Sequence, residues 1–291
     1  MISVVIPTYG GSERLDRNLP SVVRALHGGD RDWEILVVED GGEPLPPQPQ
    51  GVRVLRLPRN RGYGPAVNAG ATQARGELLL VLNDDVRLHE DALVILERHL
   101  ESDVMATVPA IRSPLAACGD EGGKRGRVQA GLIEIMEAPS KSIQPTLYPV
   151  GCCFLCRRDI FQSFGGYDER YAPFFWEDVD LGYRAWRSGL RSLHVPAAVC
   201  WHEGSATLAQ EYEMAERARM FDRNRILFHL LNTQAPLRQS CLGALLARAL
   251  FEDAASSRTA LSEALDVFSA APRTPQPGSS DATILQRASA C

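Results

Sequence analysis

The chain has 291 residues, of which 45% are hydrophobic and 23% are charged, and its formal net charge is −5. This length can bury one large core or two smaller ones, and the acidic balance excludes a protein that binds nucleic acid by neutralising phosphates. No apolar run approaches the roughly 20 residues that a membrane span needs. The seven scattered cysteines do not suggest a secreted disulfide framework, so we expect a reducing cytoplasm.

The first hundred residues alternate between strand and helix patterns. Continuous or alternating apolar runs predict strands at residues 2–7, 34–38, 52–57, 78–82 and 104–108. Apolar residues at helical spacing predict helices between these strands, over residues 12–26, 65–76 and 93–100. This alternation is typical of a mostly parallel sheet with helices on both faces.

The rest of the chain is less regular. Glycine and charged residues at 117–131 predict a mobile loop or a hairpin, and order returns with a strand in 148–158. Further helices are predicted over residues 174–189, 210–231 and 240–268. The composition of the tail, residues 271–291, predicts disorder.

Polar side chains follow four of the predicted strands, where each strand ends. These segments are Pro7-Thr8-Tyr9, Glu39-Asp40, Asn60-Arg61-Gly62 and Asn83-Asp84-Asp85. Ligands of open parallel sheets bind outside the carboxyl ends of the strands, so we expect the four segments to converge on one crevice.

The adjacent carboxylates of Asp84 and Asp85 need an explanation, because like charges repel each other and resist burial. The glycine fingerprints of nucleotide-binding loops are absent, and paired carboxylates instead suit a hard divalent cation that bridges a substrate diphosphate. The alternative is a turn or a helix cap, which is the usual role of an isolated Asn-Asp-Asp. Asp40 at a neighbouring strand end favours a site, and its carboxylate can accept the imide N–H of uracil or thymine.

Seven motifs in the same order resemble those of glycosyltransferase family 2. They are VVIPTYG, VVEDGG, NRGYGPAVNAG, LNDDV, GGYDE, WEDVDL and the later His202. The resemblance covers residues 2–204 and is closest to the non-processive, rhamnosyltransferase-like members, because the Q-x-x-R-W motif and the membrane spans of processive synthases are absent. It implies an α/β, type-A glycosyltransferase fold with a Rossmann-like, mostly parallel central sheet flanked by helices and a helical C-terminal extension.

The resemblance also implies an activity. It is an inverting, metal-dependent transfer of one sugar from a UDP- or dTDP-sugar to a hydroxyl of a glycan, lipid-linked or small-molecule acceptor, with Mn²⁺ or Mg²⁺ as cofactor. In this reaction a carboxylate takes the proton of the attacking hydroxyl. The motif WEDVDL assigns this role to Asp178, with Glu177 beside it, whereas Asp180 fits an acidic helix N-terminus that gains only dipole energy.

Other residues are assigned by the same resemblance. The metal ligands are Asp85, Asp84 and His202, although a single histidine after a strand is more often structural. Residues implied to line the nucleotide-sugar site are Pro7, Thr8, Tyr9, Glu39, Asp40, Asn60, Gly62, Asn68, Asn83, Asp84 and Trp176. Asn83 departs from the family pattern, since it replaces the first Asp of the D-x-D element and removes one charge.

By the resemblance, residues 1–110 form a nucleotide-sugar-binding half, and 111–205 an acceptor-binding half with the catalytic base. Residues 206–270 form a helical extension before the tail at 271–291. We expect a cytoplasmic protein, and three roles stay open for the extension: peripheral contact with the inner face of the membrane, a homodimer interface, or cover for the core. Two other functions stay open, a sugar-phosphate nucleotidyltransferase and an inactive nucleotide-sugar-binding relative.

Overall fold

The protein is built around a nine-stranded mixed sheet. The computed structural model describes residues 1–10, 12–42, 44–114, 116, 119–204, 212–251, 255–273 and 275–290. The parallel half of the sheet consists, in spatial order, of β3 (Val52–Arg56), β2 (Trp33–Glu39), β1 (Ile2–Thr8) and β4 (Leu78–Leu82). The other half continues with β10 (Cys153–Arg157), β6 (Val104–Arg112), β11 (Arg191–His202) and β5 (Val86–Leu88).

The second half of the sheet mixes strand directions. Strand β10 is antiparallel to both β4 and β6, whereas β11 is parallel to β6. Strands β5 and β9 (Gln144–Thr146) pair with β11 in the antiparallel sense. The pairing of β11 with β5 places His202 opposite Val86, directly after Asp85. The sheet topology therefore brings together two segments that are far apart in the sequence.

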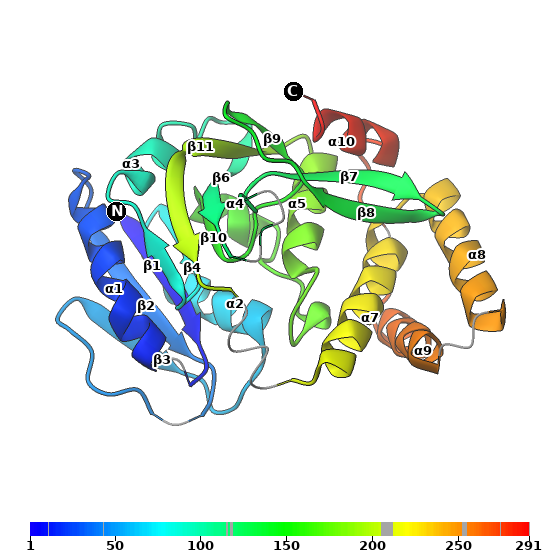
Figure 1. Cartoon of the computed structure of the whole chain (residues 1–291), viewed down its shortest axis with the longest axis horizontal. Helices are drawn as coiled ribbons and strands as arrows, with labels where there is room; N and C mark the ends of the chain where they lie inside the picture. The colour runs from blue at the N-terminus through cyan, green and yellow to red at the C-terminus, as the bar shows by residue number, and fades with distance from the viewer. Residues whose placement is uncertain are drawn as a thin grey trace.

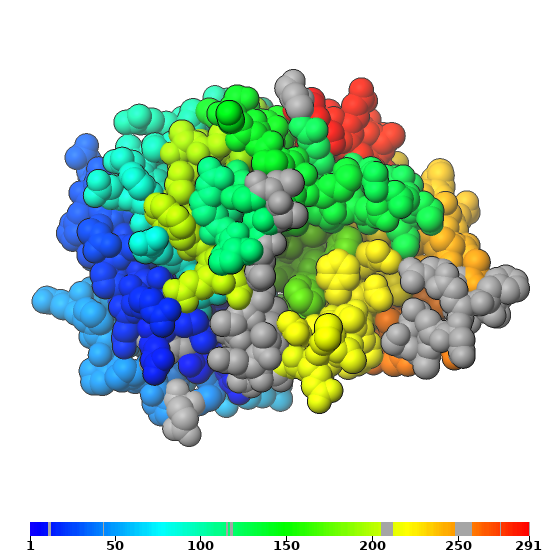
Figure 2. Space-filling view, in the orientation of Figure 1, coloured from blue at the N-terminus to red at the C-terminus, as the bar shows by residue number. Residues whose placement is uncertain are grey.

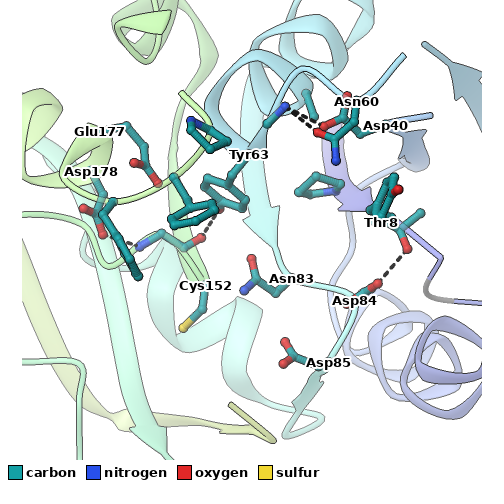
Figure 3. A pocket seen from close by; sticks show the side chains of 18 of the residues that line it. Thr8, Asp40, Asn60, Tyr63, Asn83, Asp84, Asp85, Cys152, Glu177 and Asp178 are labelled. Carbon is teal, nitrogen blue, oxygen red and sulfur yellow. Dashed lines mark hydrogen bonds between the residues drawn. The ribbon is translucent and has the colours of Figure 1, made fainter. Parts of the chain in front are cut away.

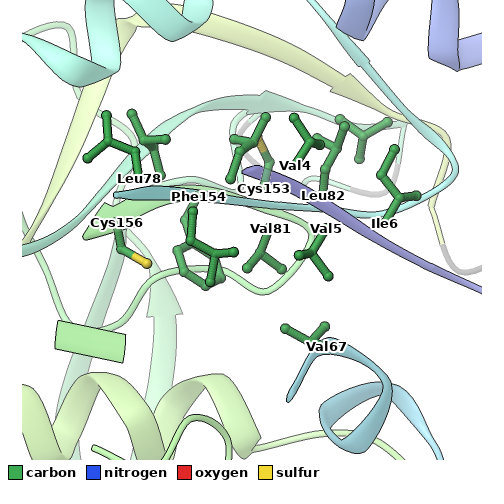
Figure 4. Packing of buried hydrophobic residues seen from close by; sticks show 14 of the residues in the cluster. Val4, Val5, Ile6, Val67, Leu78, Val81, Leu82, Cys153, Phe154 and Cys156 are labelled. Carbon is green, nitrogen blue, oxygen red and sulfur yellow. The ribbon is translucent and has the colours of Figure 1, made fainter. Parts of the chain in front are cut away.

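Helices cover both faces of the sheet, as the alternating pattern predicts (Figure 1). On one face lie α1 (Ser12–His27) and α3 (Ala92–Glu97), and on the other lie α2 (Tyr63–Gln73) and α4 (Arg158–Ser163). Val5, Val81 and Phe154 point towards Val67 of α2, while Val4 points to the opposite face (Figure 4). Each fully buried aliphatic side chain of this kind contributes about 1.5–3 kcal/mol.

A second core joins the C-terminal helices to α5 (Glu177–Arg187) and the segments around it. It includes Tyr183 of α5, Phe228 of α7 (Met214–Asn232) and Ala260 of α9 (Ala255–Ala270). Alongside lie α8 (Ala235–Phe251) and the hairpin of β7 (Lys124–Gln129) and β8 (Leu132–Glu137). In the space-filling view the C-terminal helices, yellow to orange, form one end of the molecule and the N-terminal residues, in blue, form the other (Figure 2). No described helix is long and apolar enough to cross a membrane.

Three expectations from the sequence need correction. The strand expected within 148–158 begins only at Cys153, and the helix expected over 240–268 is divided between α8 and α9. The tail expected to be disordered contains α10 (Asp281–Arg287). Composition concealed this helix, but its signals are local: Ser280 accepts a hydrogen bond from Thr283 N–H as an N-cap, and Ile284 is buried.

Candidate active site

A cavity of about 310 Å³ opens at the carboxyl ends of β1, β2 and β4 (Figure 3). Most of the predicted site residues line it: Pro7, Thr8, Tyr9, Asp40, Asn60, Gly62, Asn83, Asp84, Asp85, Glu177, Asp178 and His202. The two halves of the fold meet here, because the lining also includes Gly151, Cys152 and the aromatic side chains Phe174, Phe175 and Tyr212. The convergence expected from the strand ends is therefore present in the structure.

Asp84 is held by partners within the protein. Thr8 Oγ1 donates to its Oδ2 at 2.6 Å, and Nε of Arg14, in α1, lies 3.3 Å from its Oδ1. Burial raises the pKa of Asp84, and the Thr8 hydroxyl and the Arg14 guanidinium oppose this rise. Sequence analysis missed Arg14, whose only signal is its place in the first turns of the helix after β1. With these contacts Asp84 fixes the turn after β4 in place.

Asp85 faces His202. Its Oδ1 lies 3.3 Å from His202 Nε2, and Glu121 Oε2 lies 3.8 Å from the other ring nitrogen, Nδ1. Burial lowers the pKa of His202, but the carboxylates of Asp85 and Glu121 outweigh burial and raise it to about 9. Glu121 was also missed, since it lies in the glycine-rich segment that predicts only a loop or hairpin.

The Asp85–His202 pair has the features of a cation site. Asp85 Oδ1 and both ring nitrogens of His202 are buried and have no hydrogen-bond partner, and buried polar atoms are rarely left unsatisfied. Carboxylate oxygen is a ligand that suits Mn²⁺ and Mg²⁺, and imidazole nitrogen is a common ligand of divalent transition-metal ions. Within the described ranges no cluster of three or more such side chains is placed to hold a metal. A cation here would thus need further ligands from a substrate or water.

Asp40 organises the loop after β3. Arg61 N–H and Gly62 N–H donate to its two carboxylate oxygens, each at 2.8 Å. Burial raises the pKa of Asp40, and the two N–H groups oppose the rise. Gly62 has a φ of 95°, and a Cβ there would lie 2.6 Å from Cα and O of Pro173, so the position requires glycine. An ionised carboxylate has about four acceptor positions, so Asp40 can still accept from a ligand in the cavity.

Asp178 and Glu177 begin α5 at the opposite end of the cavity (Figure 3). Gly151 N–H donates to Asp178 Oδ2 at 3.0 Å, and Val179 N–H donates to Oδ1 at 2.8 Å. Burial raises the pKa of Asp178, and these donors oppose the rise. Burial and the charge of Asp178 raise the pKa of Glu177 well above its usual range. Burial therefore disfavours the charged forms of both carboxyl groups.

Three predicted residues lie outside the cavity lining. Glu39 forms an ion pair with Arg56 at 2.8 Å, and Asn68 Nδ2 donates to Tyr167 O at 2.8 Å. Trp176 is buried in the second core against Phe228. The structure places all three where they support the loops around the cavity.

The acidic residue Asp180 serves the structure, as its place in the first helical turn indicated. Its carboxylate is fully buried, and Arg184 Nε lies 2.7 Å from Oδ2. Burial raises its pKa, but Arg184 and Arg273 outweigh burial and hold it at about 2. Asp180 thereby anchors α5 to the C-terminal segment.

Comparison with known proteins gives consistent matches. The sequence profile described as glycosyl transferase family 2 matches residues 3–165. The N-acetylglucosaminyl-diphospho-decaprenol L-rhamnosyltransferase of Mycobacterium tuberculosis is 28% identical over 239 residues, which cover 69% of this chain and 76% of that protein.

Solved structures share the fold. A crystal structure of GalNAc-T7 with UDP, GalNAc and Mn²⁺ matches with a TM-score of 0.56 at 20% identity, over 95% of this chain and 59% of that chain. This chain thus spans less than two thirds of that one. Residues 1–349 of S. aureus TarS in complex with UDP-GlcNAc match with a TM-score of 0.54 at 17% identity, over 93% of this chain and 81% of that chain. Both are glycosyltransferases of the type-A fold.

Proposed function

Because the chain belongs to glycosyltransferase family 2, we propose that it transfers one sugar from a UDP- or dTDP-sugar to an acceptor hydroxyl, with inversion at the anomeric carbon. The observation that supports this proposal best is that one cavity contains acidic side chains at two separate places. Asp85 and His202 lie at the sheet edge, and Asp178 and Glu177 lie at the start of α5. Inverting transfer needs one group for the leaving diphosphate and another for the attacking hydroxyl.

The donor nucleotide is proposed to bind in the half formed by residues 1–110. Thr8, Asp40 and Asn60 line its end of the cavity, and Asp40 is a suitable acceptor for the imide N–H of uracil or thymine. Asn83 Oδ1 lies between the two ends of the cavity without a hydrogen-bond partner. A neutral amide at this position binds the sugar or ribose hydroxyls without adding to the negative charge of Asp84 and Asp85.

Asp85 and His202 are proposed to hold Mn²⁺ or Mg²⁺ together with the donor diphosphate. A bound divalent cation supplies charge neutralisation as the diphosphate leaves. Asp84 supports this site indirectly, because Thr8 and Arg14 occupy its oxygens and keep the turn that carries Asp85 in place. GalNAc-T7 was crystallised with UDP and Mn²⁺ in the same fold, which supports the assignment.

Asp178 is proposed to accept the proton of the acceptor hydroxyl. Its carboxylate lines the cavity and is oriented by Gly151 N–H and Val179 N–H. Glu177 lines the cavity beside it and is proposed to position the donor sugar or the acceptor. One base suffices for this reaction, because the metal and not a second carboxylic acid assists the leaving group.

The acceptor is proposed to be a glycan or a lipid-linked sugar that enters along the half formed by residues 111–205. The relative from Mycobacterium tuberculosis is named for a decaprenol-linked acceptor, which supports a lipid-linked substrate. On this proposal the protein works at the cytoplasmic face of a membrane and contacts it from the surface.

A donor and metal screen tests the function. Purified protein is incubated with UDP- and dTDP-sugars, Mn²⁺ or Mg²⁺, and lipid-linked or oligosaccharide acceptors, and release of nucleoside diphosphate is measured. Acceptor-dependent release that EDTA abolishes is the expected result. A preference for nucleoside triphosphates would favour a nucleotidyltransferase, and metal-dependent donor binding without turnover on any acceptor would favour an inactive relative.

A further inference from the structure

The segment before α5 lies beside the cavity in an unusual backbone conformation. Phe175 and Trp176 have φ values of 76° and 73°, in the left-handed region that L side chains rarely adopt. They directly precede Glu177 and Asp178, and Phe174 and Phe175 line the cavity. Trp176 O still accepts the first hydrogen bond of α5, from Asp180 N–H at 2.9 Å, whereas the carbonyl groups of Phe174 and Phe175 lie before the helix and need other donors.

Asn224 of α7 satisfies these carbonyl groups. Its Nδ2 donates to the carbonyl oxygens of Tyr171, Phe174 and Phe175, at 2.7, 2.8 and 2.9 Å; because the amide has two N–H bonds, one of them is shared between two of these oxygens. The side chain is fully buried, and its Oδ1 accepts from Arg223 Nε at 2.9 Å. One amide group thus fixes three points of the segment that leads into the catalytic carboxylates.

Arg223 fixes the same segment one residue earlier along α7. Its Nη2 donates to Arg170 O at 2.6 Å and to Ala172 O at 3.2 Å. Both side chains belong to the C-terminal extension, yet their partners are main-chain atoms of the catalytic half. An apolar side chain could fill the volume of Asn224 but could not satisfy three buried carbonyl groups.

We propose that Asn224 is a positioning residue for the transfer reaction. It holds residues 171–176, which include the left-handed Phe175 and Trp176, in the conformation that points Asp178 into the cavity, and it does so without contacting the substrate itself. This inference rests on the proposed function, since it takes Asp178 as the base. It assigns α7 a role in turnover beyond covering the core.

The test combines two variants of Asn224 with a control in the same helix. Asn224→Ala removes all three hydrogen bonds, and Asn224→Ser retains one donor in case the alanine variant does not fold. Leu230→Ala is the control, because Leu230 is a buried core residue of α7 and makes no hydrogen bond to the segment through its side chain. Thermal melting, UDP affinity by calorimetry with Mn²⁺, and kcat are measured for each protein.

Asn224→Ala is expected to lower kcat about 100-fold, the usual effect of a misplacement of about 1 Å at the reacting centre. Affinity for UDP should stay within about twofold, because the nucleotide end of the cavity is built from other strands. Asn224→Ser should fall between wild type and alanine. Leu230→Ala should lower the melting temperature but change kcat by no more than about twofold.

A double-mutant cycle separates positioning from general damage. If Asn224 acts through Asp178, Asn224→Ala should have almost no further effect on kcat in an Asp178→Asn background. An equal loss of kcat in both backgrounds, or a kcat of wild-type size in Asn224→Ala, overturns the inference alone. Absence of transfer by the wild-type protein with every donor and acceptor overturns the proposed function as well.

Discussion

Replacement of Asp178 by asparagine should remove the proposed catalytic base while keeping the shape of the side chain. The two carboxylate oxygens accept from Gly151 N–H at 3.0 Å and from Val179 N–H at 2.8 Å. Asparagine has one acceptor oxygen, so one of these bonds is lost, at a cost of about 1–3 kcal/mol. Burial raises the pKa of Asp178, so removal of its buried charge offsets part of this cost. Stability should therefore change little.

Turnover should respond much more strongly. Loss of a general base lowers kcat by about 10²–10⁴, which corresponds to roughly 2.7–5.4 kcal/mol of transition-state stabilisation. Donor affinity should not change, because Thr8 and Asp40 lie at the other end of the cavity from Asp178.

Glu177 supplies a matched control. Burial and the charge of Asp178 raise the pKa of Glu177 well above its usual range, which favours the neutral form of its side chain. Glutamine has nearly the same shape and the same charge as a protonated glutamate. Glu177→Gln should therefore keep kcat within about tenfold of wild type, a smaller loss than that of a general base.

The assay follows nucleoside diphosphate release at saturating donor and acceptor, and calorimetry with Mn²⁺ gives the donor Kd. Near-normal turnover of Asp178→Asn would refute its role as base. The opposite pattern, a large loss in Glu177→Gln and a small one in Asp178→Asn, would transfer that role to Glu177.

Three further predictions concern the metal site, a buried histidine and a loop glycine. Asp85→Ala should abolish the Mn²⁺-dependent part of UDP binding in calorimetry, and an unchanged dependence on Mn²⁺ would contradict the metal assignment. Burial lowers the pKa of His229 to about 4, so as the pH falls the unfolded state binds a proton before the folded state does. Roughly 3 kcal/mol of stability should therefore be lost between about pH 6.5 and pH 4. Urea denaturation across this range should show a shallower slope with pH in His229→Gln than in wild type. Gly62→Ala should cost more than the roughly 1–2 kcal/mol of a left-handed alanine, since Pro173 lies 2.6 Å from the added Cβ. Gly10 has a φ of 60° and no atom within 4 Å of an added Cβ, so Gly10→Ala should be destabilised only by the left-handed strain. Equal melting temperatures of the Gly62→Ala and Gly10→Ala variants would be inconsistent with the clash.

The parts of the fold that depend on local pattern were predictable from the sequence. The apolar runs of β1, β2 and β4 mark strands buried on both faces, and the polar residues after them mark the edge where a ligand binds. The convergence of Asp40 with Asp84 and Asp85 follows from the parallel order of these strands.

The residues that sequence reasoning missed act through tertiary contacts. Arg14 reaches Asp84 across 70 positions, and Asn224 reaches Phe174 across 50. Nothing in the neighbouring sequence of either residue distinguishes it from a polar residue on a helix surface. Their roles come from the need to satisfy buried polar groups, and the partner is known only once the chain is folded. Glu39 shows the reverse case, since it follows the strand-end pattern but forms its ion pair with Arg56.

The structure divides the two adjacent carboxylates after β4 between different cations. Arg14 Nε lies 3.3 Å from Asp84 Oδ1, so the positive charge of Arg14 compensates the charge of Asp84 within the folded protein. Asp85 Oδ1 lies 3.3 Å from Nε2 of His202, and the carboxylates of Asp85 and Glu121 raise the pKa of His202 to about 9. Burying two like charges side by side costs several kcal/mol unless each has its own counter-charge. Arg14 therefore compensates Asp84 and protonated His202 compensates Asp85, so a metal ion bound as proposed would have to displace the proton of His202.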